Sequence, residues 1–287
     1  MTNPWTKVAG TAALVAAVRA RESARPDGLF DDPFAQRLAG PAGLEMLERM
    51  VARVGPQSTT QIVVRTRFWD EALLRAAPVC RQVVLLAAGL DARAFRLPWP
   101  AAVTVFEVDQ PAVIEAKAAL LAGEPPRCTR IPVGTDLTAD WPTVLVDAGL
   151  NPAAPTAWLV EGLLQYLTAT GVGTLFARLD ALSAPGSVLL YDVVGRSLLD
   201  APVMADLRRT MDEQGAPWLF GTDDPGALAG RLGWTTRVTD VAEPGYAWGR
   251  WHSPPAPAGV AGTPRGYFVE AVKPNVEPLP DLPSEQL

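Results

Sequence analysis

The chain has 287 residues, 48% of them hydrophobic, with a formal net charge of -6 and two cysteines. This length and apolar fraction predict a globular protein with one large core or two small ones. The negative charge and the lack of a Lys/Arg block argue against a nucleic-acid-binding surface, because phosphate binding depends on clustered cations.

Residues 1–80 are predicted to form a helical cap, integrated with the core, with breaks near residues 26–28, 31–33 and 55–56. The apolar run 8–18 after Lys7 loosely fits a signal peptide, but it is rich in alanine and leads into the charged stretch RARES. No segment approaches the roughly 20 apolar residues that span a bilayer. We therefore expect a cytoplasmic protein without a membrane segment.

After residue 80 the pattern alternates between short apolar strands and helices. The expected strands are residues 83–87, 104–108, 130–133, 158–160, 188–191, 235–238 and 266–272, and clear helices are residues 111–121 and 175–182. Continuously apolar strands between helices indicate an α/β core with a largely parallel sheet covered on both faces. We place this core at residues 81–272.

Three other segments complete the expected architecture. Residues 195–230, after the fifth strand, are predicted to be a helical insertion that forms a lid. The Pro/Gly-rich residues 253–264 are expected to form a hairpin loop at the sheet edge. The tail, residues 273–287, has too little apolar surface to pack and is expected to be mobile.

Ligands of an open parallel sheet bind beyond the carboxyl ends of its strands. Gly89 follows the first strand, where a missing side chain lets a ligand approach the backbone closely. Asp109 lies 20 positions further on, the interval at which a carboxylate accepts hydrogen bonds from ribose. A phosphate cradle would need more glycines, but Leu90, Ala92 and Ala94 stand there. A ligand with a ribose and no phosphates is indicated, and S-adenosylmethionine meets that description.

Two more residues after predicted strands fit this ligand. Asp136 can accept from the adenine amino group while the Leu137 amide donates to a ring nitrogen. Glu161 directly follows the fourth strand, where its carboxylate can hold the ammonium of the methionine moiety. The competing interpretation is that Asp109 and Asp136 only cap the helices that follow them.

Four segments taken together resemble a known family. QVVLLAAGLDARAFRL, FEVDQP, DLTADWP and PTAWLVEGLLQYL are similar to the successive motifs of the leucine carboxyl methyltransferase family, especially its actinobacterial branch. The resemblance extends from about Thr11 to the last strand. It implies a class I methyltransferase (Rossmann-like) fold, with seven strands of which the last is antiparallel, and S-adenosylmethionine as cofactor.

The resemblance also implies the cofactor-binding residues. They are Gly89, Asp109, Asp136, Leu137 and Glu161, joined by Arg21 and Arg65, which would clamp the methionine carboxylate. Arg19, Arg25 and Arg67 are near enough in sequence to take that role instead. The chain departs from the family at Ala92, where many relatives carry threonine, so a hydroxyl contact there is lost. Family membership fixes the cofactor better than the acceptor.

The expected reaction is direct displacement at the sulfonium methyl, which requires alignment and exclusion of water. A carboxylate acceptor needs no base, whereas a hydroxyl acceptor needs one. His252, the only histidine, is a candidate base, and Tyr191 or Asp192, expected just after the fifth strand, are others. This scarcity of bases favours carboxyl methylation. The tryptophan-containing lid favours a hydrophobic acid or a polyketide-like metabolite over a protein C-terminus.

Two other enzyme classes fit the sequence less well than a methyltransferase, and one non-enzymatic class fits it equally well. A nicotinamide-dependent oxidoreductase would need more glycines, and a hydrolase of the G-x-S-x-G type lacks its motif. One histidine and two distant cysteines do not make a zinc cluster, so no metal is expected. A non-catalytic S-adenosylmethionine-binding protein remains open, as does the oligomeric state.

Overall fold

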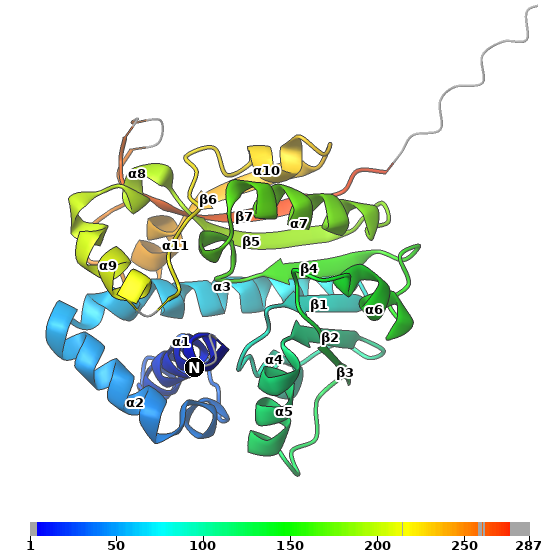
Figure 1. Cartoon of the computed structure of the whole chain (residues 1–287), viewed down its shortest axis with the longest axis horizontal. Helices are drawn as coiled ribbons and strands as arrows, with labels where there is room; N and C mark the ends of the chain where they lie inside the picture. Colours follow the sequence, from blue (N-terminus) through cyan, green and yellow to red (C-terminus); the bar gives the residue numbers. More distant parts are fainter. Residues whose placement is uncertain (1–4, 214, 258–259, 261, 276–287) are drawn as a thin grey trace, which may run out of the picture.

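The computed structural model describes residues 5–213, 215–257, 260 and 262–275, and its centre is a seven-stranded sheet in the order β3-β2-β1-β4-β5-β7-β6 (Figure 1). The strands are β1 (Gln82–Leu86), β2 (Thr104–Asp109), β3 (Thr129–Gly134), β4 (Thr156–Val160), β5 (Val188–Val194), β6 (Thr235–Asp240) and β7 (Gly266–Val272). The pairs among β1 to β5 are parallel, and β7 is antiparallel to both β5 and β6. The predicted class I methyltransferase fold is confirmed.

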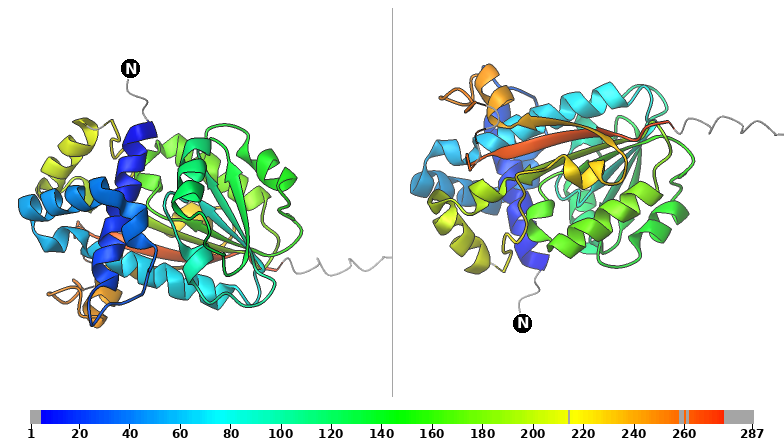
Figure 2. Two further views of the ribbon diagram at one scale, coloured as in Figure 1. Left: turned by 90° about the horizontal axis from the view of Figure 1, so that it is seen from below. Right: turned by 90° about the horizontal axis from the view of Figure 1, so that it is seen from above.

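Helices cover both faces of this sheet (Figure 2). The longer ones are α1 (Trp5–Ser23), α2 (Ala35–Val54), α3 (Thr60–Ala76), α5 (Pro111–Leu120), α6 (Trp141–Asp147), α7 (Ala169–Ala181) and α9 (Ala205–Glu213). The short ones are η1 (Pro56–Thr59), α4 (Arg93–Arg96), η2 (Leu164–Tyr166), α8 (Arg196–Leu199), η3 (Pro202–Met204), α10 (Ala227–Gly230) and α11 (Ala242–Ala247).

Alternation along each strand divides the core into two layers. Val83 and Leu85 of β1 pack with α1, α2 and α3, whereas Val84 and Leu86 pack with α6 and α7 on the opposite face. The same alternation decides on which face of the sheet each residue near the carboxyl end of a strand lies. Leu190 faces the α3 side, so Asp192, two positions on, lies on that side as well.

The N-terminal helices pack closely on one another and on the sheet. Helix α2 is kinked at Gly40, whose φ of 57° is left-handed, and at Pro41, which has no N–H to continue the helical ladder. No break was expected at this position from the sequence. The expected break near residue 55 is confirmed, because Gly55 ends α2 with a φ of 86°. Trp69 of α3 is fully buried and stacks edge-on against Phe268 of β7.

Two expectations need correction, and a third is confirmed. Tyr191 and Asp192 lie inside β5, which extends to Val194, and not after it. The insertion at residues 195–230 is helical, as expected: its described residues include α8, η3, α9 and α10, which are joined by non-helical segments because glycines and prolines interrupt any longer helix. Lys273 is held rather than mobile, since its Nζ donates to the Asp180 carbonyl at 2.8 Å; residues 276–287 lie outside the described part of the chain.

The connection between β6 and β7 joins two antiparallel neighbours, as expected for a hairpin, but it begins with the short helix α11.

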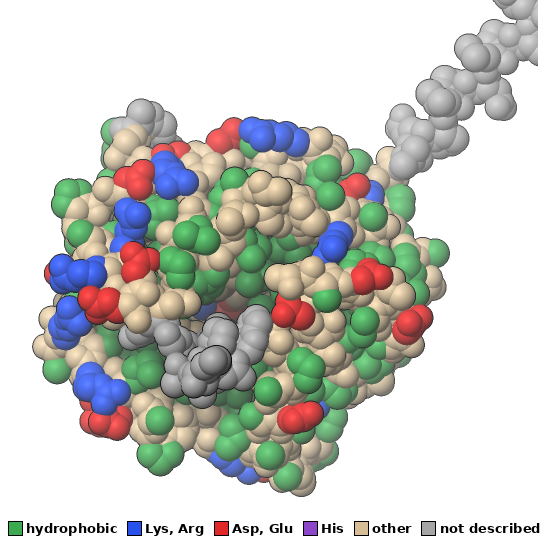
Figure 3. Space-filling view, viewed as in Figure 1, with side chains coloured by type: hydrophobic (Ala, Val, Ile, Leu, Met, Phe, Trp, Pro, Cys, Tyr) green, Lys and Arg blue, Asp and Glu red, His purple; other side chains and the backbone are tan. Residues whose placement is uncertain are grey.

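Charged side chains of both signs are interspersed over the face shown in Figure 3. Within the described residues, no helix combines the length and the hydropathy needed to cross a bilayer.

Candidate functional site

The loop after β1 turns sharply where the cofactor was predicted to bind. Ala87 and Gly89 both have positive φ, 51° and 50°, and the Gly89 amide donates to Asp109 Oδ2 at 2.6 Å. Asp109 Oδ1 accepts from the Gln110 amide at 2.7 Å. Burial raises the pKa of Asp109, and these two bonds offset it only in part. Further hydrogen-bond donors, such as ribose hydroxyls, would stabilise the ionised form of this buried carboxylate. The geometry of the loop is therefore compatible with the ribose of the cofactor.

The helix-cap interpretation of the two aspartates is wrong. Helix α5 has Gln110 at its N-cap position and α6 has Asp140, neither with a side-chain cap. Asp136 instead closes a tight turn, in which its Oδ1 accepts from the Thr138 amide at 2.8 Å and from the Thr138 hydroxyl at 2.7 Å. The amide bond lowers the pKa of Asp136 and keeps it ionised. Its neighbour Leu137 is likewise only half-buried, at the same edge of the sheet.

Glu161, directly after β4, is held by two arginines. Arg65 of α3 donates through Nε to Glu161 Oε1 at 2.9 Å, and Arg93 donates through Nη1 to Oε2 at 2.7 Å. Burial alone would raise the pKa of Glu161, but Arg93 and Arg65 lower it on balance. Gly162 makes this approach possible, because a Cβ there would lie 3.0 Å from the Arg65 guanidinium. The structure thus brings together Arg65 and Glu161, the two residues that were each expected at the methionine end of the cofactor.

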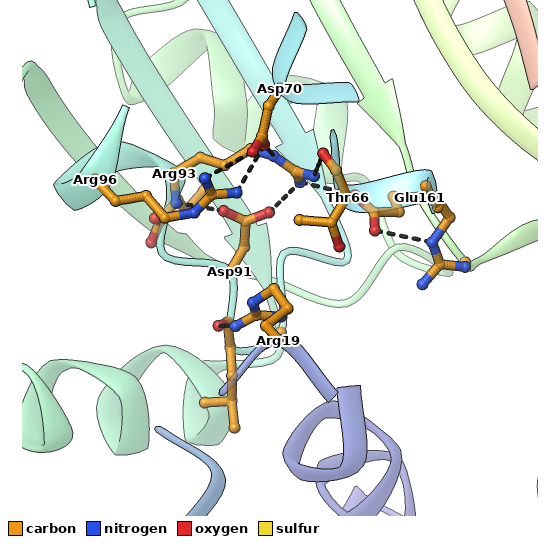
Figure 4. A network of polar contacts seen from close by, with 12 residues as sticks. Arg19, Thr66, Asp70, Asp91, Arg93, Arg96 and Glu161 are labelled. Atoms are coloured by element: carbon orange, nitrogen blue, oxygen red, sulfur yellow. Dashed lines mark hydrogen bonds and ion pairs between the residues drawn. The ribbon is translucent and has the colours of Figure 1, made fainter. Parts of the chain in front are cut away.

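Behind Glu161 lies a buried ionic network that no motif in the sequence indicates (Figure 4). Arg93, only 2% exposed, donates through Nε to Asp70 Oδ1 at 2.7 Å and also pairs with Asp91. Arg96 forms two further 2.7 Å bonds to the same Asp70 carboxylate. Because Asp70 belongs to α3, Asp91 to the loop after β1, and Arg93 and Arg96 to α4, the network ties α3 to the segment that follows β1.

Acid should weaken this network through Asp91. Burial would raise the pKa of Asp91, but the arginine and lysine charges around it, Arg93 above all, lower it from 3.8 to about 2. A lowered pKa stabilises the fold above pH 4, and this contribution disappears as the pH falls toward 2. We expect the stability gap between wild type and Asp91→Asn to be constant from pH 7 to 5. By pH 3 it should narrow by about 1 kcal/mol.

Urea unfolding at each pH measures that gap. A gap that stays constant down to pH 3 would mean that Asp91 is not held in its ionised form by the fold.

The structure brings Arg19, and not Arg21, to the Gly89 loop. Arg19 is buried, with Nη2 donating to the Leu90 carbonyl at 2.6 Å and Nε to Asp32 at 2.8 Å. Arg21 is exposed and bonds to the Thr59 hydroxyl between α1 and η1. Its placement therefore does not support the predicted contact with the methionine carboxylate.

The three candidate bases are placed very differently. Tyr191 faces α7, and its hydroxyl donates to the Pro225 carbonyl at 2.7 Å, while burial raises its pKa. Asp192 accepts from the Gly162 amide at 2.7 Å and from Arg65 at 3.2 Å. His252 is exposed on the loop after α11. Among the described residues, no group of three or more His, Cys, Asp or Glu side chains is arranged to hold a metal ion.

The sheet order and the carboxylates at its switch point define a protein of the class I methyltransferase fold. Two solved structures share the fold over 92% of this chain. A DUF574 family protein from Streptomyces avermitilis is 17% identical with a TM-score of 0.63 over 97% of its own length, and a "putative methyltransferase" from Thermobifida fusca is 18% identical with a TM-score of 0.61 over 94%.

Sequence comparison is more specific than fold. The model of the leucine carboxyl methyltransferase family matches residues 12–180. A protein from Parafrankia sp. named "putative S-adenosyl-L-methionine-dependent methyltransferase" is 41% identical over 92% of this chain and 86% of its own length. One of the same name from Mycobacterium avium is 42% identical over 72% of this chain and 74% of its own. The chain belongs to the leucine carboxyl methyltransferase family.

Proposed function

We propose that the protein methylates the carboxylate of a small hydrophobic acid and so forms a methyl ester. Membership of its family makes it an S-adenosyl-L-methionine-dependent methyltransferase. The choice of a carboxylate acceptor rests on one observation about the candidate bases: Tyr191 and Asp192 are already engaged in hydrogen bonds, and His252 is exposed on the loop after α11. An acceptor that is already ionised needs none of them.

The cofactor supplies a methyl group on a sulfonium, which is an activated leaving group. Asp109 would accept from the ribose hydroxyls beside the Gly89 backbone, and Glu161 would hold the ammonium. Asp136 and the Leu137 amide would read the adenine. Arg65, already next to Glu161, would hold the methionine carboxylate.

The acceptor carboxylate oxygen would form a bond to the methyl carbon as the carbon–sulfur bond breaks. The products are a neutral ester and S-adenosylhomocysteine, and no proton moves. The protein's task is then alignment of the two groups and exclusion of water. A protein C-terminus is the less favoured acceptor.

The compartment is proposed from the cysteines. Both Cys80 and Cys128 are free thiols, which supports a reducing cytoplasmic compartment.

Calorimetric titration tests the cofactor site first. We expect wild type to bind S-adenosylmethionine and S-adenosylhomocysteine at about -8 kcal/mol, on the order of micromolar, and not to bind reduced nicotinamide cofactors. Asp109→Ala should lose about 1.5–3 kcal/mol of this, because it removes a charged hydrogen-bond acceptor. Asp140→Ala, a change at an exposed aspartate in the loop before α6, is the matched control and should bind normally.

A second assay separates the acceptors. Transfer of labelled methyl to decanoic acid, and not to 1-decanol, is the expected result. Transfer to the alcohol that depends on His252 would favour hydroxyl methylation instead. Cofactor binding without transfer to any acid or alcohol would favour the non-catalytic alternative.

A further inference from the structure

Two polar side-chain atoms close in the chain or in space to the segment after Glu161 are buried without a hydrogen-bond partner. They are Gln165 Oε1 and Trp218 Nε1. Gln165 is only 6% exposed, and its Nε2 donates to the Gly162 carbonyl at 3.0 Å, which leaves Oε1 as an unused acceptor. The Trp218 ring packs edge-on against Tyr166, with centroids 6.5 Å apart, and its N–H is an unused donor. Buried polar groups in proteins are nearly always paired, so both atoms need an explanation.

The backbone places these two residues side by side. The amides of Leu219 and Phe220 both donate to the Gln165 carbonyl, at 2.6 and 3.3 Å, so residues 218–220 lie against η2. Helix η2 begins three residues after Glu161, at the end of β4. Strand β4 borders the point where the strand order reverses, and ligands of such sheets bind there.

The other unpartnered atoms among the described residues have a different setting. The indole nitrogens of Trp69 and Trp141 belong to fully buried core side chains. The unpartnered atoms of Glu107, Lys117 and Arg130 belong to one buried ion-pair cluster. The fourth such charged residue is Arg96, whose guanidinium forms an ion pair with Asp70. Gln165 and Trp218 are the pair that lies at η2, next to the segment that carries Glu161.

We propose that Gln165 and Trp218 recognise the acceptor, and that this acceptor is an acid with a hydroxyl close to its carboxyl group. The inference rests on the proposed carboxyl methylation. The hydroxyl of the acid donates to Gln165 Oε1, and its non-reacting carboxylate oxygen accepts from Trp218 Nε1. Gln165 is then a specificity-determining residue, and Trp218 holds either kind of acid. The half-exposed Leu219 and the Tyr166 ring offer apolar contact to the rest of the molecule.

Labelled methyl transfer to 3-hydroxydecanoic acid and to decanoic acid measures this preference. We expect kcat/KM of the wild type to be at least 10-fold higher for the hydroxy acid. Gln165→Met should bring the two values together by lowering that of the hydroxy acid alone. Trp218→Phe keeps an aromatic ring, and it should lower kcat/KM roughly 10-fold for both acids.

Trp141→Phe is the matched control, because it removes an equally unpartnered indole nitrogen from the core. It should leave both values unchanged. Every variant should bind S-adenosylmethionine as wild type does. Equal kcat/KM values for the two acids in wild type, or a preference that survives in Gln165→Met, would overturn the proposal.

Failure to methylate either acid by a protein that binds the cofactor would also overturn it. Failure to bind the cofactor at all would instead count against the proposed function.

Discussion

Arg93→Met is expected to lower the free energy of unfolding by about 3–5 kcal/mol, the range found when one partner of a buried ion pair is removed. Arg93 contacts three carboxylates, those of Asp70, Asp91 and Glu161. Methionine fills similar space but leaves all three with one cation fewer. Because they are buried, water cannot replace the lost bonds in full.

Urea unfolding of purified protein measures the loss. Arg49→Met is the matched control, since Arg49 pairs with Glu45 on the exposed surface of α2 and such pairs contribute little. If Arg93→Met is insoluble while Arg49→Met folds normally, the expected direction holds. A variant within about 1 kcal/mol of wild type would contradict the role given to the network.

The second large effect is expected on cofactor binding by Arg65→Met. Loss of a charged hydrogen bond to the methionine carboxylate should weaken binding of S-adenosylmethionine by about 2–3 kcal/mol, roughly 30- to 150-fold. Decarboxylated S-adenosylmethionine has no such group. Its affinity should therefore be similar for wild type and for the variant.

Two companion variants sharpen this comparison. Arg21→Met should bind both ligands normally, because the exposed Arg21 guanidinium donates to the Thr59 hydroxyl. Arg65→Lys retains the charge between Glu161 and Asp192 and guards against misfolding. An equal loss of affinity for both ligands in Arg65→Met would mean that Arg65 acts by holding Glu161, and not by binding the carboxylate.

The positions of Gly89, Asp109 and Glu161 could be predicted because they depend on strand ends. An apolar run marks a buried strand, and in a parallel sheet the residues after each strand meet at one edge. Alternation along β5 could also have separated Tyr191 from Asp192. It was missed because the predicted strand ended at residue 191, three residues before β5 ends at Val194.

The arginines could not be assigned from sequence. Two positions along a helix rotate a side chain by about 200°, so Arg19 and Arg21 face almost opposite ways, and only packing decides which faces the loop. Arg93 and Asp70 are 23 residues apart on different elements. No local pattern predicts their contact, although two arginines three residues apart in a buried segment, at 93 and 96, are unusual enough to be a signal.

Strand β7 has a consequence for the synthesis of the protein. It is the last of the seven strands of the sheet in chain order, yet it lies between β5 and β6, and its Phe268 and Val269 are fully buried. Until residues 266–272 leave the ribosome, β5 has an open edge and β6 has no neighbour. Exposed apolar edges of this kind pair readily with other chains. The nascent chain is thus most prone to aggregate just before β7 emerges.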